Sequence, residues 1–275
     1  MKRKTKKFFW FLCFLLVGLL VLWYFQNYTF TTTTTEIYTN KVTTPIRVVQ
    51  LSDLHGAQYG DKNNRLVSAV KNQTPDIICV TGDMFTNGDT MGMDTAHVLM
   101  KQLVTIAPVY FVPGEHDNDS LFMEEMKGYG VVPLLYGKET VTIKNNQVTL
   151  YGIDNVYYTD TFNLFREFDK PSEHSLNILL AHIPNFDAFN WFGPDISLCG
   201  DTHGGVVQLP LVGPLYFNGE WFPQITSNQQ YVTDKGLFKT YTGYVYVSGG
   251  LGNYPYPVRF FNRPELSVIT FLPQE

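Results

Sequence analysis

Four of the six histidines in this chain follow apolar segments, and three of them stand within two residues of an acidic residue, a pattern that could serve chemistry. The other two, His97 and His174, are assigned to a helix and a surface loop. Any single case would be an ordinary turn, because Asp and Gly are common where strands end. Together, however, imidazoles and carboxylates without thiolates are the donors of hydrolytic centres that hold Mn, Fe, Zn or Mg. The residues concerned are Asp53, His55, Asp83, Glu115, His116, Asp117, His182, Asp201 and His203.

The elements that must position these residues are short apolar strands that alternate with helices in the first part of the chain. Each of five apolar segments runs directly into one of the candidate turns. In α/β sheets, ligand sites form at the carboxyl ends of the strands, so the side chains that follow these strands can converge. Apolar residues at helical spacing predict the intervening helices. The predicted strands are 46–51, 76–80, 109–112, 176–180 and 196–199, and the predicted helices are 63–72, 94–105 and 121–127.

The order and spacing of these motifs resemble those of the calcineurin-like metallophosphoesterases. The resemblance extends from about residue 43 to the C-terminus, and segments 248–252 and 259–265 look like the closing part of that family's membrane-anchored bacterial branch. It implies an α/β fold, the four-layer αββα sandwich of these enzymes. The matching motifs are 53–55, 82–83, 114–117, His182 and 200–203.

The resemblance also implies a role for each site residue. His116 would lie beside the leaving-group oxygen as proton donor or electrostatic stabiliser, and Asp117 would orient it. Asp83 would bridge two divalent ions, and a pair of ions at such a site activates water for in-line displacement at phosphorus. The first ion would be held by Asp53, His55, Asp83 and His203, and the second by Asp83, Glu115, His182 and Asp201.

Two positions depart from the family pattern, which usually has asparagine at the position of Glu115 and histidine at that of Asp201. Each replacement can still ligate, but each adds a negative charge. We therefore expect a harder second site that favours Mn or Mg over Zn, and a more alkaline rate optimum. Of the two divalent ions, Mn is the first expectation, with Mg, Fe or Zn as alternatives. A membrane-tethered metal- or phosphate-binding domain that has lost catalysis is the competing interpretation.

The N-terminus predicts a membrane anchor. Residues 8–25 carry no charge and would span ~27 Å as a helix, close to the hydrocarbon thickness of a bilayer. A cleaved signal peptide is the rival interpretation, but no Ala-x-Ala-like site follows. The preceding basic cluster predicts a single-pass protein of the cell membrane with a cytoplasmic N-terminus and an extracytoplasmic domain. The predicted parts are a cytoplasmic basic tail (1–7), a transmembrane signal anchor (8–25), a short Thr-rich linker (26–35) and a metallophosphoesterase domain (36–275).

Charge and composition narrow the functional classes further. The net charge is −5, and five of the 20 basic residues lie in the first seven positions, which leaves 15 against 25 acidic residues in the rest. An acidic body lacks the basic face that nucleic-acid binding requires. The three cysteines do not form a disulfide framework.

The expected substrate is a phosphodiester or pyrophosphate, with a lipid-linked, nucleotide or cell-wall compound as candidates. Aromatic stretches at 221–222 and 254–256 suggest lipid linkage, although ordinary packing is favoured for them. For Arg259 and Arg263 we expect an ion pair with Glu265 or another acid rather than a phosphate contact. Segment 157–175 is either a lid over the site or a packed surface helix, and the sequence does not distinguish the two.

Overall fold

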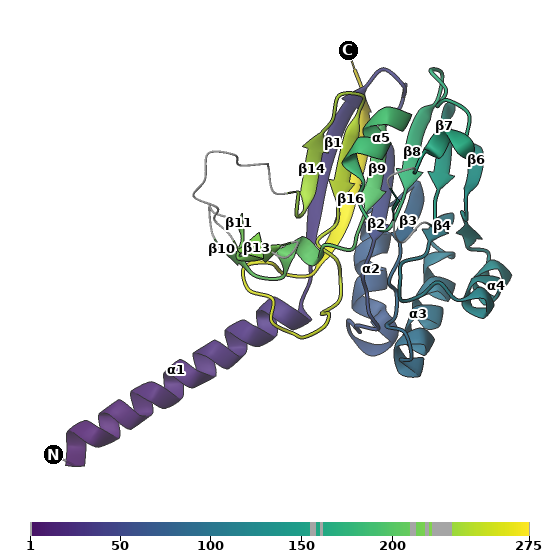
Figure 1. Cartoon of the computed structure of the whole chain (residues 1–275). Coiled ribbons are helices and arrows are strands. Elements are labelled where there is room, and N and C mark those ends of the chain that lie inside the picture. The colour runs from purple at the N-terminus through teal and green to yellow at the C-terminus, as the bar shows by residue number, and fades with distance from the viewer. Residues whose placement is uncertain are drawn as a thin grey trace.

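Two mixed β-sheets stand face to face, and helices cover the outer face of each (Figure 1). The computed structural model describes residues 2–154, 158–159, 162–209, 213–217, 220–221 and 233–274. Each of the two main sheets has six strands. The layers therefore follow the order helix, sheet, sheet, helix, which confirms the predicted αββα fold.

The first sheet has the strand order β1-β16-β2-β3-β4-β5. From β2 to β5 all neighbours are parallel, whereas β16 runs antiparallel to β2 and parallel to β1. The carboxyl ends of β2, β3 and β4 consequently lie side by side. The strands are β1 (Thr31–Thr39), β16 (Glu265–Pro273), β2 (Ile46–Leu51), β3 (Ile77–Thr81), β4 (Val109–Val112) and β5 (Val132–Pro133).

The second sheet has the order β14-β15-β9-β8-β7-β6. Its four central strands are parallel, and antiparallel strands close both edges. Two short hairpins, β10–β11 and β12–β13, follow the η3 turn. The strands are β14 (Gly236–Lys239), β15 (Tyr244–Val247), β9 (Ile196–Cys199), β8 (Leu176–Leu180), β7 (Asn146–Gly152) and β6 (Gly137–Ile143), and the remaining elements are η3 (His203–Gly205), β10 (Gln208–Leu209), β11 (Gly213–Pro214), β12 (Tyr216–Phe217) and β13 (Glu220–Trp221).

Helices cover the outer faces because each presents an apolar stripe to a sheet. On the first sheet, α2, α3 and α4 bury residues such as Leu66, Leu99 and Phe122. On the second sheet, η2 and α5 bury Leu164 and Phe189. Side-chain caps set the starts of several helices, as the Asp119 carboxylate does by accepting hydrogen bonds at the start of α4. The helices are η1 (Asp61–Asn63), α2 (Asn64–Asn72), α3 (Thr90–Leu103), α4 (Ser120–Tyr129), η2 (Leu164–Arg166) and α5 (Phe186–Phe192).

A third apolar cluster fills the space between the two sheets. Val48 and Ile77 from the first sheet and Ile178 and Ile196 from the second belong to it, and all four are at most 1% exposed. Burying side chains of this size stabilises the fold by about 1.5–3 kcal/mol each relative to exposure. This packing holds the two sheets in a fixed relation, and with them the strand ends that carry the site.

The Thr-rich segment 31–35 is not a linker but the first half of β1, so the predicted boundary at residue 36 is corrected. Its residues pair in register with β16, from Thr31 with Glu265 to Thr39 with Pro273. Threonine is β-branched and suits a strand, and its side chains here alternate between exposed and half-buried. Helix α3 also begins earlier than predicted, at Thr90, because the Asp89 side chain accepts from the Gly92 N–H.

The predicted membrane segment forms the long helix α1 (Lys2–Tyr28), which projects away from the sheets in Figure 1. Its part Lys6–Tyr28 contains an apolar window with a mean hydropathy of 2.5 that is not buried against the protein, whereas Gln26 and Asn27 near the end of the helix are buried. By length and composition this helix can cross a membrane. Only two residues separate its end from the start of β1, so the folded body follows the apolar helix almost directly.

The part of segment 157–175 that the structure describes packs on the second sheet. Phe168 is buried, and its ring lies 5.3 Å from that of Tyr151 on β7. Of the two alternatives, this favours the packed surface segment over a lid for residues 162–175. The stretch 155–157, with 160 and 161, lies outside the described residues, as does Phe222 of the aromatic stretch 221–222.

Candidate metal centre

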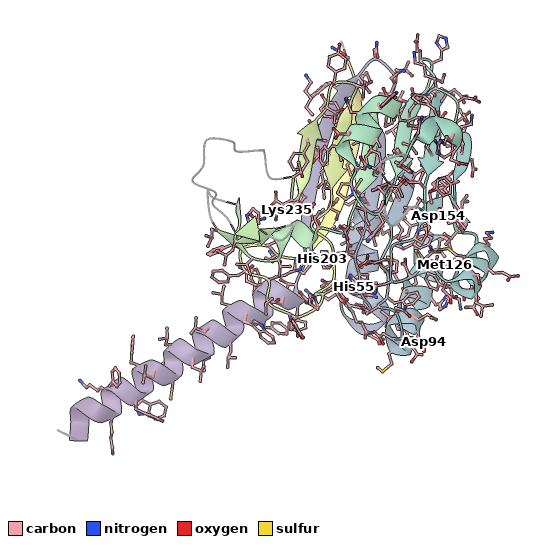
Figure 2. The ribbon with its side chains drawn as sticks, viewed as in Figure 1. His55, Asp94, Met126, Asp154, His203 and Lys235 are labelled. Carbon is pink, nitrogen blue, oxygen red and sulfur yellow. The ribbon has the colours of Figure 1, made fainter. Side chains whose placement is uncertain are left out.

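The nine predicted site residues follow the carboxyl ends of five strands, and the fold brings these ends together. Strands β2, β3 and β4 are neighbours in the first sheet, and β8 and β9 are neighbours in the second. Figure 2 shows His55 and His203, one from each sheet, close to where α1 joins the body. Asp53 and His55 follow β2, Asp83 follows β3, Glu115, His116 and Asp117 follow β4, His182 follows β8, and Asp201 and His203 follow β9.

Asp83 occupies the middle of the centre. Its Oδ2 atom lies 3.5 Å from Nε2 of His55 and 3.4 Å from Nε2 of His182. Nε2 of His203 lies 3.2 Å from Nε2 of His55 and 3.8 Å from Oδ1 of Asp53. Three overlapping sets of side chains are close enough to share an ion, namely Asp53 with His55 and His203, His55 with Asp83 and His116, and Asp53 with Asp83 and His182.

The donor atoms of the centre fit divalent cations. Oδ2 of Asp53 and Nε2 of His116 are buried, and among the described residues they have no hydrogen-bond partner. Burying such atoms without a partner is costly unless something binds them. Oxygen and nitrogen donors in this mixture suit Mn, Fe, Zn or Mg, so the side chains present fit the metal expected from the sequence.

The backbone of the centre is held in sparsely populated conformations. Five non-glycine residues have positive φ angles, between 45° and 71°. This left-handed region costs free energy for residues with a Cβ atom, and such residues cluster at functional sites. The five are Asp53, His55, Asp83, Asp201 and His203.

Burial and neighbouring charges shift the protonation of the candidate ligands in opposite directions. Burial raises the pKa of Asp53 to about 7 and lowers that of His55 to about 4. For Asp83, burial acts to raise the pKa, but contact with His182 and the charge of His55 prevail and lower it to about 2. Burial likewise opposes the charged form of His182, yet Asp83 and Asp53 hold its pKa well above the usual value. Without a cation, the centre therefore holds protons that a metal ion would displace.

Each of three imidazoles is fixed by a contact at its second nitrogen. Nδ1 of His182 lies 2.8 Å from the carbonyl oxygen of Thr81, and Nδ1 of His55 lies 3.0 Å from Oγ1 of Thr86. Nδ1 of His203 lies 3.2 Å from Nη2 of Arg259, and burial together with this guanidinium lowers the pKa of His203. Contacts of this kind fix the ring orientation of imidazoles that bind metals.

The predicted orientation of His116 by Asp117 stays a prediction, because the described contacts of the Asp117 carboxylate are with the main chain. The two carboxylate oxygens of Asp117 accept from the N–H groups of Met84 and Gly114, both at 2.7 Å. The buried carboxylate thus ties the turn after β3 to the turn after β4 and fixes the backbone beside Asp83. His116 itself lies in the set of potential ligands around Asp83, and its role at a leaving group stays a prediction.

Glu115 and Asp201 lie beside the centre but belong to none of the three ion-sharing sets. Oε1 of Glu115 is 3.7 Å from Nε2 of His116, and Oδ1 of Asp201 is 3.8 Å from Nε2 of His182. The N–H of Asp201 donates to Oδ1 of Asp53 at 2.9 Å. Their ligation of a second ion therefore stays a prediction.

Two residues near the centre have contacts that the sequence did not predict. The ring of Tyr254 stacks on His55, with centroids 4.5 Å apart and an interplanar angle of 11°. Arg259 is buried and donates to the carbonyl oxygens of Gly249 and Gly252, each at 2.8 Å, instead of forming the expected ion pair with Glu265. In the sequence, the resemblance of the C-terminal segment to the family pointed to this region. The aromatic stretch that contains Tyr254 was interpreted as ordinary packing.

Comparisons with known proteins agree with this geometry. The family model described as calcineurin-like phosphoesterase matches residues 46–205, which is more than half of the chain. A metallophosphoesterase of Bacillus subtilis named YkuE is 26% identical over 233 residues, covering 82% of this chain and 78% of that one. The phosphodiesterase YaeI of Escherichia coli is 26% identical over 238 residues, covering 82% of each chain. A bovine transmembrane protein with a metallophosphoesterase domain is 28% identical over 246 residues, covering 81% of this chain and 52% of that one.

Proposed function

Because this chain belongs to the calcineurin-like phosphoesterase family, and is thereby a hydrolase of phosphoric esters, we propose that it cleaves a phosphodiester or pyrophosphate bond at the bilayer surface. The observation that carries the proposal is the position of Asp83, whose single Oδ2 atom faces His55 on one side and His182 on the other. A carboxylate oxygen so placed suits a bridge between two cations.

Residues that follow strands of both sheets contribute ligands to each of the two proposed cation sites. Asp53, His55 and His203 would hold one cation with Asp83, and His182 would hold a second with Asp83, joined by Glu115 and Asp201. Cations in these positions would stabilise charge on the phosphoryl oxygens and lower the pKa of a water molecule. His116 lies in the set of potential ligands with Asp83 and would donate the proton to the leaving group. Manganese is the expected ion, because four carboxylates make the site hard.

Helix α1 anchors the protein in the cell membrane. The basic residues that precede its apolar part support a cytoplasmic N-terminus and an extracytoplasmic catalytic body. The short distance between α1 and β1 then keeps the metal centre near the lipid headgroups. A lipid-linked phosphoester is accordingly the preferred substrate over a soluble nucleotide.

Turnover of bis-p-nitrophenyl phosphate by the full-length protein in detergent, with Mn²⁺ supplied, tests the function. We expect Asp83→Ala to lower the rate by about 100-fold or more, since outer-shell changes alone already cost 10–100-fold. Glu173→Ala is the control, because the side chain of Glu173 is 82% exposed and the residue lies before the amino end of β8, at the end of the sheet opposite the metal centre. Equal rates for the two variants would contradict catalysis at this centre.

A membrane-tethered domain that binds metal or phosphate without catalysis is the second candidate. It is favoured by the positions of Glu115 and Asp201 outside the ion-sharing sets. Metal binding by calorimetry that Asp83→Ala abolishes, together with no turnover under any divalent ion, would support this candidate over the enzyme.

A further inference from the structure

The loop Asn253–Arg263, called here the helix-contact loop, wraps around the end of α1. Near its start, Nδ2 of Asn253 donates to the carbonyl oxygen of Asn27 at 2.8 Å. In the middle, the indole Nε1 of Trp23 donates to the carbonyl oxygen of Pro257 at 2.7 Å. At its end, the guanidinium of Arg263 lies 4.1 Å from the ring centre of Phe25. The loop is therefore held to the last turns of the apolar helix along most of its length.

The side chain of Asn27 forms two hydrogen bonds with the main chain of this loop. Its Oδ1 accepts from the N–H of Arg259 at 2.7 Å, and its Nδ2 donates to the carbonyl oxygen of the same residue at 3.2 Å. Asn27 is 1% exposed. These paired bonds prevent the loop from moving independently of the helix.

The contact with Trp23 sets the depth of the loop relative to a membrane. Trp23 lies inside the uncharged stretch 8–25, about 3 Å below its last residue along the helix axis. Tryptophan near the end of a membrane helix marks the boundary between headgroups and hydrocarbon. When α1 spans a bilayer, Pro257 must consequently lie at that boundary.

The residues around Pro257 have side chains that suit such a position. Tyr256 is 69% exposed and Val258 is 53% exposed, and Phe261 further along the loop is 53% exposed. Apolar side chains that gather on one loop are otherwise a liability in water. Their continuity with the exposed apolar surface of α1 identifies the covering medium as lipid rather than another protein.

The same loop reaches the metal centre. Tyr254 stacks on His55, and Nη2 of Arg259 lies 3.2 Å from Nδ1 of His203. A cavity of ≈ 400 Å³ lies between the end of α1 and the centre, with Asn27 and Tyr28 on one side and His55 on the other. The loop thus joins the membrane helix to two candidate metal ligands.

From these contacts we propose that the helix-contact loop is a second membrane-binding element, with Tyr256, Pro257 and Val258 seated among the lipid headgroups. It holds the mouth of the metal centre against the bilayer, so that the cavity opens at the level of the lipid phosphates. The inference rests on the proposed membrane anchoring by α1, but it does not require catalysis.

A spin label at position 258 of the full-length protein in nanodiscs of phosphatidylcholine and phosphatidylglycerol tests this inference. Val258→Cys is made in a Cys13→Ala background, since Cys79 and Cys199 are buried. Tyr241→Cys is the matched control, because Tyr241 is 95% exposed in the β14–β15 turn, at the end of the second sheet opposite the metal centre. The measured quantity is the ratio of collision rates with oxygen and with a water-soluble nickel complex.

We expect this ratio to be severalfold higher at position 258 than at position 241, with Tyr256→Cys as a second labelled site in case the first variant does not fold. Equal ratios at the loop and at the control would overturn the inference, as would failure of the chain to enter nanodiscs. The readout needs no turnover, so an inactive but membrane-seated protein would contradict only the proposed function.

Discussion

The Nε2 atoms of His55 and His203 lie 3.2 Å apart, although one imidazole follows a strand of the first sheet and the other a strand of the second. Two imidazole nitrogens at this distance are well placed to share an ion. An ion bound there would join the two halves of the sandwich at one edge. The metal centre is therefore expected to contribute to stability as well as to chemistry.

Removal of divalent ions should lower the unfolding temperature for this reason. An ion at 100 times its dissociation constant stabilises the native state by about 2.7 kcal/mol. Thermal unfolding with and without a chelator measures the effect. His55→Ala should lose most of the response, whereas His174→Ala, an exposed histidine, should keep it. A response that persists in His55→Ala would place the stabilising ion elsewhere.

Metal binding should release protons in a pH-dependent way. Because burial raises the pKa of Asp53 to about 7, this carboxyl is protonated below pH 7 in the absence of a cation, and binding must displace the proton. Apparent affinity should thus rise with pH up to about 7. Calorimetry in buffers of different ionisation enthalpy counts the protons, and Asp53→Asn should release fewer of them. A proton count independent of pH between 5 and 8 would contradict the assignment.

The two additional carboxylates should set metal preference. Replacing Glu115 by Asn together with Asp201 by His removes two negative charges, and we expect a shift from Mn toward Zn and a less alkaline rate optimum. Metal content after equilibration with equal Mn and Zn, and the pH–rate profile, are the measurements. Glu124→Asn with Asp187→His removes the same charge at exposed positions and serves as control. Unchanged preference in the site variant would mean that neither residue ligates.

Asn27→Ala should lower the metal affinity of the centre, although Asn27 lies outside the centre. The change leaves the N–H and carbonyl groups of Arg259 without their partner and costs about 1–3 kcal/mol of stability. Because Arg259 contacts His203, metal affinity should fall by about 10-fold, as is usual when support behind a ligand is lost. Metal competition with a fluorescent chelator measures this. Gln26→Ala is the control, since Gln26 is also buried in the same helical turn but its Oε1 has no partner among the described residues. An equal loss in both variants would indicate general disturbance of the helix end.

The sequence by itself determined the parts of the site that depend on local order. Apolar strands with Asp or His directly after them are visible in the chain, and the parallel arrangement of such strands makes their ends converge. The candidate ligands Asp53, His55, Asp83, His182 and His203 were all predicted in this way, and the structure brings them together. The resemblance of these motifs to a known family supplied the two-sheet architecture.

The tertiary structure alone decided the contacts between residues distant in the chain. Segment 31–35 is a strand only because β16, more than two hundred residues later, pairs with it. The carboxylate of Asp117 accepts from two main-chain N–H groups in turns that follow different strands, a contact that the sequence did not predict. Asn27 meets Arg259 because the end of the apolar helix α1 and a late loop pack together. Local periodicity carries no information about such pairs, since their free energy arises only when both segments are in place.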